Sequence, residues 1–258
     1  MKKPIAKLEQ VTLEYKIQGI RTQRSIKELL SLKSGGEGNH KGTYRALENI
    51  NLEFYWGDNV GVIGENGAGK STLLKILGRI ILPSKGRIRL WADPIPLLGI
   101  GTGFNPDLSG RDNVYIYSSF LGKKKNAIDR VMDDIIAFAE LEKFIDQPIS
   151  SYSKGMVARL GFSTIMADEP KLLMVDEILG VGDDYFKEKC REVFLDLRGK
   201  NATLIIVSHS LPFLNSFCNR VVWIKDKHIF MDGDPEEVTD AYKKYMQDKR
   251  AKKLAKWN

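Results

Sequence analysis

The chain has 258 residues, of which 43% are hydrophobic and 28% charged, and this fits one large domain or two small ones, with a substantial core. No apolar run approaches the ~20 residues of a membrane span and no signal peptide is visible, so we expect the chain to stay in the cytosol, dissolved or docked on a membrane from inside. The net charge of +7 gathers in residues 1–45 and 243–258, which suits an anionic lipid surface, or solvated ends, better than duplex nucleic acid.

Two alternating segments near the N-terminus, residues 8–15 and 50–54, predict half-buried antiparallel strands. Between them, residues 18–43 read as an insert. Ser25 and Glu28 form a capping box at the start of a short amphipathic helix with basic flanks, and a glycine-rich loop follows. Such a helix suits a membrane interface or a membrane subunit; the alternative is a surface helix packed on its own domain.

Short apolar runs without alternation predict strands buried on both faces, as in a parallel sheet covered by helices. They occupy residues 60–63, 172–175 and 204–207. Apolar residues at helical spacing predict a mainly helical segment at about 106–168. A hairpin is expected over residues 220–231, and Pro235 begins a closing helix that we extend to residue 258. The expected class is therefore α/β.

A phosphate-binding loop follows the first of these strands. The segment fits the pattern GxxxxGK[ST] between a strand and a helix, and it comprises Gly64, Glu65, Asn66, Gly67, Ala68, Gly69, Lys70, Ser71 and Thr72. Glycines let successive backbone N–H groups point at phosphate oxygens, and the helix N-terminus adds its positive dipole end. Lys70 reaches the β- and γ-phosphates, and Ser71 can ligate Mg²⁺. The sequence therefore predicts ATP and Mg²⁺ as ligands.

Polar residues follow the other two buried strands. Asp176 ends the run at 172–175, where it can hold Mg²⁺, and Glu177 is placed to orient or deprotonate the attacking water. His209 follows the run at 204–207, where a neutral imidazole could donate a hydrogen bond to the γ-phosphate. We therefore expect Glu177 and His209 to be the catalytic residues.

Residues 151–156, Ser-Tyr-Ser-Lys-Gly-Met, resemble the signature motif of ABC ATPases. Their form is similar to that of the ATP-binding subunits of exporters for O-antigen, capsular polysaccharide and teichoic acid. Residues 101–113 and 176–183 resemble further segments of that family, and the resemblance covers nearly the whole chain. It implies an ABC-type P-loop ATPase fold: a mixed, largely parallel core sheet, an N-terminal antiparallel β-subdomain and an α-helical subdomain within a single nucleotide-binding domain, residues 1–258.

The resemblance also implies residue roles around the nucleotide. Tyr15 would stack on adenine. Tyr44 is the alternative, because the insert changes the number of residues between this position and the phosphate-binding loop. Asn105 would occupy the Q-loop position near Mg²⁺ and the attacking water, although glutamine is common there in ABC ATPases.

Other implied roles lie across a dimer. Ser153, Lys154 and Gly155 would face the γ-phosphate of ATP held by a second copy of the chain, and Asp183 would bridge the two copies. Lys154 replaces a serine of the family variant, so it either helps to bind ATP or points to solvent.

The resemblance implies three partners: a second copy of the chain, a separate transmembrane permease in two copies, and a lipid-linked glycan at the cytoplasmic face of the inner membrane. No nucleic acid is expected. One alternative is an ABC ATPase that serves another transporter, for lipid or teichoic acid. A soluble non-transport ABC ATPase is the other, but the single phosphate loop and the lack of sustained heptads argue against it.

Overall fold

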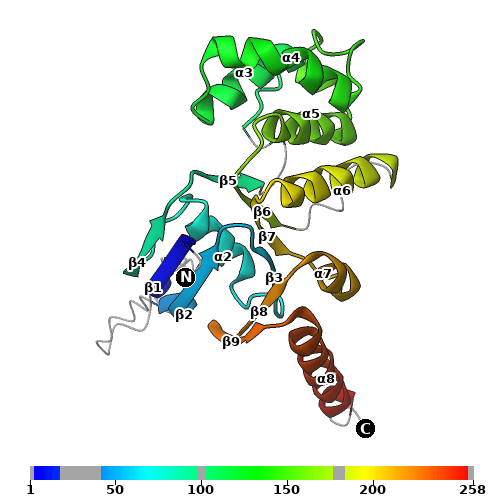
Figure 1. The fold of residues 1–258 in the computed structure, drawn as a ribbon. Helices are drawn as coiled ribbons and strands as arrows, with labels where there is room; N and C mark the ends of the chain where they lie inside the picture. Colours follow the sequence, from blue (N-terminus) through cyan, green and yellow to red (C-terminus); the bar gives the residue numbers. More distant parts are fainter. Residues whose placement is uncertain (1–2, 18–41, 98–100, 102, 177–183, 255–258) are drawn as a thin grey trace, which may run out of the picture.

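The computed structural model describes residues 3–17, 42–97, 101, 103–176 and 184–254 (Figure 1). An antiparallel sheet near the N-terminus has the strand order β2-β1-β4. It consists of β1 (Pro4–Ile17), β2 (Gly42–Tyr55) and β4 (Lys85–Leu90). The predicted strands at 8–15 and 50–54 lie within β1 and β2. Residues 18–41 of the predicted insert lie outside the described residues.

A second, six-stranded sheet has the order β5-β6-β7-β3-β8-β9. Its members are β3 (Asn59–Ile63), β5 (Pro94–Leu97), β6 (Leu172–Asp176), β7 (Thr203–Val207), β8 (Arg220–Lys225) and β9 (His228–Gly233). All neighbours pair in parallel except β8 and β9, which form the predicted hairpin. The expected mixed, largely parallel sheet is confirmed.

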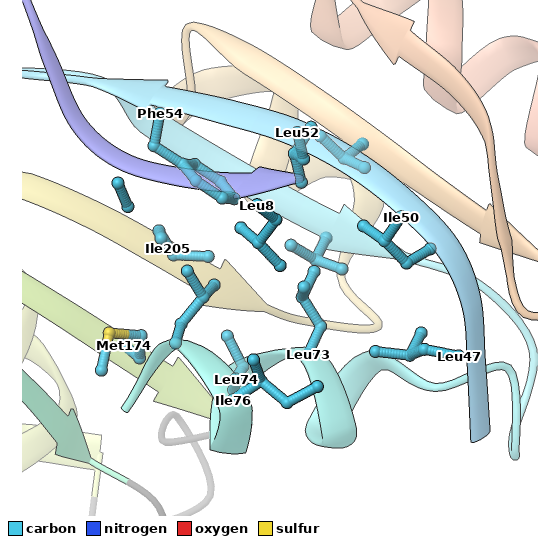
Figure 2. Packing of buried hydrophobic residues seen from close by; sticks show 14 of the residues in the cluster. Leu8, Leu47, Ile50, Leu52, Phe54, Leu73, Leu74, Ile76, Met174 and Ile205 are labelled. Atoms are coloured by element: carbon cyan, nitrogen blue, oxygen red, sulfur yellow. The ribbon is translucent and has the colours of Figure 1, made fainter. Parts of the chain in front are cut away.

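The two sheets share a core with helix α2 (Lys70–Leu77). Figure 2 shows Leu73 and Leu74 of α2 packed below Leu8 and Phe54 of the antiparallel sheet and beside Ile205 of the parallel sheet. These side chains are almost completely buried. Burial of each large apolar side chain contributes about 1.5–3 kcal/mol, so this core fixes the start of α2, and with it the phosphate-binding loop, against both sheets.

Three further helices contribute side chains to a second core with the parallel sheet: α6 (Asp184–Gly199), α7 (Leu211–Phe217) and α8 (Pro235–Leu254). Phe162, Phe186 and Phe194 meet in this core in edge-to-face contacts, with ring centroids 5.8 and 5.9 Å apart. Residues 255–258 of the predicted closing helix lie outside the described residues. No helix of the described ranges is both long and apolar enough to cross a membrane.

The predicted helical segment at 106–168 contains α3 (Gly110–Phe120), α4 (Lys125–Ala139), a 3-10 turn (Ile149–Ser151) and α5 (Lys154–Met166). Their buried faces form a third cluster, which includes Val114, Ile135 and Leu160. Figure 1 shows α3 and α4 beyond α5, on the side away from the antiparallel sheet.

Candidate functional site

The loop between β3 and α2 has the backbone geometry of a phosphate cradle. Gly64, Gly67 and Gly69 have φ angles of 151°, 78° and 112°, which residues with a side chain rarely adopt. A Cβ on Gly64 would lie 2.3 Å from the carbonyl oxygen of Ile224, and one on Gly69 would lie 2.6 Å from that of Ala46. Only glycine therefore lets the loop curl this tightly against β8 and β2.

Lys70 begins α2 and is 8% exposed. Its Nζ donates hydrogen bonds to the carbonyl oxygens of Gly64, at 2.8 Å, and Glu65, at 3.1 Å. The loop thus wraps around a buried ammonium group. Because a buried charge is costly unless it is hydrogen-bonded, these contacts hold the loop in its curled form.

A cavity of about 710 Å³ opens beside this loop. Ligand pockets typically measure roughly 300–1,000 Å³, so it has room for a nucleotide. Its lining comprises Tyr15, Tyr44, Ala46, Asn66, Gly67, Gly69, Lys70, Ser71, Thr72, Lys75, Asp176, Val207 and His209. The fold therefore brings together, from elements far apart in the chain, predicted residues of each kind: Tyr15 for adenine, Lys70 for the phosphates, Ser71 and Asp176 for the metal, and His209 for catalysis.

The ends of β6 and β7 supply the polar side of the cavity. Asp176 is the last residue of β6 and pairs with Val207, the last residue of β7, and His209 follows two residues later. Parallel neighbouring strands end at the same edge of the sheet, so Asp176 and His209 line the same cavity. Glu177 and Asp183, also predicted for this site, lie outside the described residues.

Tyr15 and Tyr44 occupy directly paired positions of β1 and β2, and both line the cavity. Their exposed fractions, 41% and 42%, are nearly equal. The Nζ of Lys227 lies 3.8 Å from the centroid of the Tyr44 ring, so one face of that ring carries a cation. The residue predicted to stack on adenine, Tyr15, and its alternative, Tyr44, thus both line the cavity.

The predicted signature residues lie apart from this lining. Ser153 is the N-cap of α5, where its hydroxyl accepts a hydrogen bond from the Met156 N–H at 3.2 Å, and Lys154 and Gly155 form the first turn. A capped helix N-terminus presents backbone N–H groups and the positive end of the helix dipole. Such a terminus favours a negatively charged group, and in the described part of one chain it does not belong to the cavity lining.

Asn105 precedes α3 and is likewise absent from the lining formed by the described residues. Its Oδ1 accepts a hydrogen bond from the Asp107 N–H at 3.0 Å, while its own N–H donates to Oδ1 of Asn113 at 2.6 Å. In this structure its side chain organises the local turn.

Sequence reasoning missed Lys75, which lies on the wall of the cavity. The available signal was its position four residues after Ser71, since residues at that spacing share a helix face. It also missed the partners of the Glu65 side chain, because these come from the far end of the chain.

Comparison with known proteins was consistent with this geometry. Residues 47–180 match the family model described as ABC transporter. The chain is 36% identical over 244 residues to the O-antigen export system ATP-binding protein RfbB of Klebsiella pneumoniae, covering 94% of this chain and 99% of that protein. It is 35% identical over 248 residues to the teichoic acids export ATP-binding protein TagH of Staphylococcus haemolyticus, covering 96% and 91%.

Among solved structures, the fold is similar to a dimeric ATP-binding cassette determined with ADP and Pi bound. The TM-score is 0.69 at 21% identity, over 89% of this chain and 98% of the other. At that identity the likeness supports the fold alone, and the expected ABC-type ATPase fold is confirmed.

Proposed function

Because this chain belongs to the ABC transporter family, we propose that it is the ATP-hydrolysing subunit of an exporter of a lipid-linked, O-antigen-like polysaccharide. The single observation that carries the ATPase assignment is the cavity at which the phosphate loop, Asp176 and His209 converge beside two tyrosines. The assignment of the cargo rests on likeness along nearly the whole chain to a protein named for O-antigen export.

In this proposal the triphosphate lies along the loop from Gly64 to Gly69. Backbone N–H groups and the N-terminus of α2 bind the phosphate oxygens, and the Lys70 ammonium exchanges its carbonyl contacts for the β- and γ-phosphates. The adenine stacks on Tyr15 or Tyr44 at the open side of the cavity.

The residues on the wall of the cavity suit Mg²⁺. The Ser71 hydroxyl and the Asp176 carboxylate are oxygen ligands of the kind that this ion prefers. No group of three or more His, Cys, Asp or Glu side chains that could hold a metal occurs among the described residues, so phosphate oxygens and water would supply the remaining ligands. When bound, Mg²⁺ neutralises charge that develops on the transferred phosphoryl group. Asn105 is proposed as a further contact to the metal, and this contact requires the turn at residues 105–107 to rearrange.

Hydrolysis needs a group that positions the attacking water, and Glu177, next to Asp176 in the sequence, is assigned that role. His209 donates a hydrogen bond to the γ-phosphate from the end of β7. Both assignments rest on position along the chain and, for His209, on its place in the cavity wall.

A head-to-tail pair of chains would complete each site. The N-terminus of α5, with Ser153, Lys154 and Gly155, then faces the γ-phosphate bound by the other copy. Asp183 is proposed to bridge the pair. Residues 1–258 form one nucleotide-binding domain in this scheme, and the helices within 106–168 are its helical subdomain.

The work of export would pass to a separate permease, present as two copies, with this chain attached at the cytoplasmic face of the inner membrane. The short helix predicted at residues 25–32, within the insert at 18–43, would lie near the membrane and the lipid-linked glycan. Deletion of residues 21–41 is then expected to spare ATP hydrolysis and lower export. Teichoic acid is the second candidate cargo, because the likeness to the teichoic acids exporter subunit is nearly as extensive.

The experiment compares Mg²⁺-dependent ATP hydrolysis by the wild-type chain and by Glu177→Gln, while light scattering follows ATP-induced dimerisation. We expect the wild type to turn over, and the variant to lose turnover but accumulate as an ATP-bound dimer. Equal rates of hydrolysis by the two chains would show that Glu177 does not position the attacking water. If neither chain hydrolyses ATP or dimerises, both are assayed again with the permease, and failure there would refute the ATPase assignment.

A further inference from the structure

The carboxylate of Glu65, within the phosphate-binding loop, is held by the C-terminal helix. The Tyr245 hydroxyl donates to its Oε2 at 3.0 Å, and the Lys249 ammonium lies 2.5 Å from its Oε1. Both partners belong to α8 and are about a turn apart, so they present their polar ends on one face of the helix. An element 180 residues distant in sequence therefore touches the loop directly.

Helix α8 is fixed where it makes this contact. The ring of Trp223, on β8, is 2% exposed and lies 5.3 Å from the rings of both Tyr242 and Tyr245. The Nζ of Lys225 lies 4.4 Å from the centroid of the Tyr245 ring. In Figure 1, α8 leaves the end of β9 beside β8, the strand that neighbours β3 and its loop. Aromatic packing thus positions Tyr245 before any nucleotide binds.

Glu65 is an unfavourable residue for a triphosphate site unless its charge is offset. The Glu65 side chain is bound to α8 and is not among the described residues that line the cavity, but it belongs to the loop whose next two residues, Asn66 and Gly67, do line it. A carboxylate carried by that loop repels a triphosphate bound there, and repulsion between like charges is strong where solvent is partly excluded. The hydrogen bond from Lys249 holds the pKa of Glu65 below its usual value, so the carboxylate is ionised at neutral pH. Protonation therefore cannot relieve the repulsion, and a nearby cation must do so.

The main chain of Glu65 connects the contact with α8 to Lys70. Its carbonyl oxygen accepts a hydrogen bond from Lys70 Nζ at 3.1 Å, while its side chain is bound to α8. The position of α8 is therefore linked through one residue to the lysine that is assigned to the β- and γ-phosphates.

We propose that Tyr245 and Lys249 are positioning residues for ATP, which hold the Glu65 side chain against α8 and offset its negative charge so that the loop accepts a triphosphate. This inference rests on the proposed binding of ATP at the cavity. The part of α8 that carries Tyr245 and Lys249 then helps to set nucleotide affinity.

The test measures the dissociation constants of a fluorescent ATP analogue and of the matching AMP analogue for the full chain. Lys249 is 53% exposed, and exposed ion pairs have modest effects, so Lys249→Met is expected to weaken ATP binding about two- to fivefold at low salt. Its effect on AMP is expected to be smaller, and high salt is expected to reduce the difference. Lys249→Arg is expected to retain wild-type affinity.

A double-mutant cycle isolates the electrostatic role. In a Glu65→Gln background, Lys249→Met is expected to change ATP affinity little, because no carboxylate remains to be offset. Lys252→Met, a change at an exposed lysine on the same helix, is the matched control and is expected to leave affinity unchanged. Equal effects of Lys249→Met in both backgrounds, or no effect in either, would overturn the inference. Failure of the wild type to bind the ATP analogue would instead refute the proposed function.

Discussion

Tyr15 and Tyr44 stand opposite each other on β1 and β2, and both rings line the cavity beside the phosphate-binding loop. The two side chains are about equally exposed, but the ammonium group of Lys227 covers one face of the Tyr44 ring. The adenine base needs an open aromatic face, so Tyr15 is the better candidate for stacking.

We expect Tyr15→Ala to weaken ATP binding at least fivefold, since stacking of a base on an aromatic side chain contributes ~1–3 kcal/mol. Tyr15→Phe keeps the ring and is expected to retain affinity. Tyr44→Ala is expected to have the smaller effect. Titration with a fluorescent ATP analogue compares the three, and a larger loss for Tyr44→Ala would assign the base to Tyr44 instead.

The tightness of the phosphate-binding loop predicts a contrast between two glycines. Alanine at either Gly67 or Gly69 adopts a positive φ, which costs about 1–2 kcal/mol. At Gly69 the new Cβ would also lie 2.6 Å from the Ala46 carbonyl oxygen, whereas at Gly67 nothing lies within 4 Å. Chemical denaturation is expected to show a clearly greater loss of stability for Gly69→Ala. Equal losses would mean that the loop relaxes at no cost.

Asn113 holds the turn that carries Asn105. It is completely buried, and its Nδ2 donates to the carbonyl oxygens of Asn105, Leu108 and Ser109 at 3.0, 3.2 and 2.8 Å. Leucine would remove the Oδ1 acceptor of the Asn105 N–H and the side-chain donor of these carbonyl oxygens, each of which keeps a backbone N–H donor. Because a buried N–H without an acceptor is costly, Asn113→Leu is expected to lower the free energy of unfolding by about 1–3 kcal/mol. Denaturant titration measures this.

The matched control for Asn113 is Ser119→Ala in the same helix, where an exposed hydroxyl donates to the carbonyl oxygen of Tyr115 at 2.7 Å. Its expected cost is within ~0.5 kcal/mol. If both variants were equally stable, the buried amide network would not be what orders this turn.

Both cysteines are predicted to be inert in the folded chain. Burial raises the pKa of Cys190 and of Cys218 to about 12, and only the thiolate reacts readily with alkylating agents. At mildly alkaline pH neither thiol is expected to react until denaturant is added, as mass spectrometry would record. Modification of the native chain at the rate of a free thiol would contradict the burial.

The same shift has a consequence for stability. The folded state retains the two thiol protons above the pKa at which the unfolded chain releases them. Their contribution to stability is therefore complete below about pH 9 and is lost as the pH rises from about 9 toward 12. The alkaline slope of the unfolding free energy is expected to flatten in a Cys190→Ala, Cys218→Ala double variant. An unchanged slope would assign it to other groups.

Features that depend on local pattern could be predicted from the amino-acid sequence. The strand at 60–63, the glycine spacing and Lys70 predicted a phosphate-binding loop, and the buried runs that end at Asp176 and before His209 placed both at one sheet edge. The structure has these strands and places Lys70, Asp176 and His209 on one cavity, because strand periodicity and glycine conformation are set by neighbouring residues.

Which distant side chains meet could be seen only in the folded chain. Tyr15 and Tyr44 are both at the cavity because they are paired in the register of β1 and β2. Lys227 covers a face of Tyr44 because the turn of the β8–β9 hairpin lies beside that ring. Tyr245 reaches Glu65 because α8 packs on Trp223. Such contacts depend on how whole elements pack, and no local pattern in a single sequence records that arrangement.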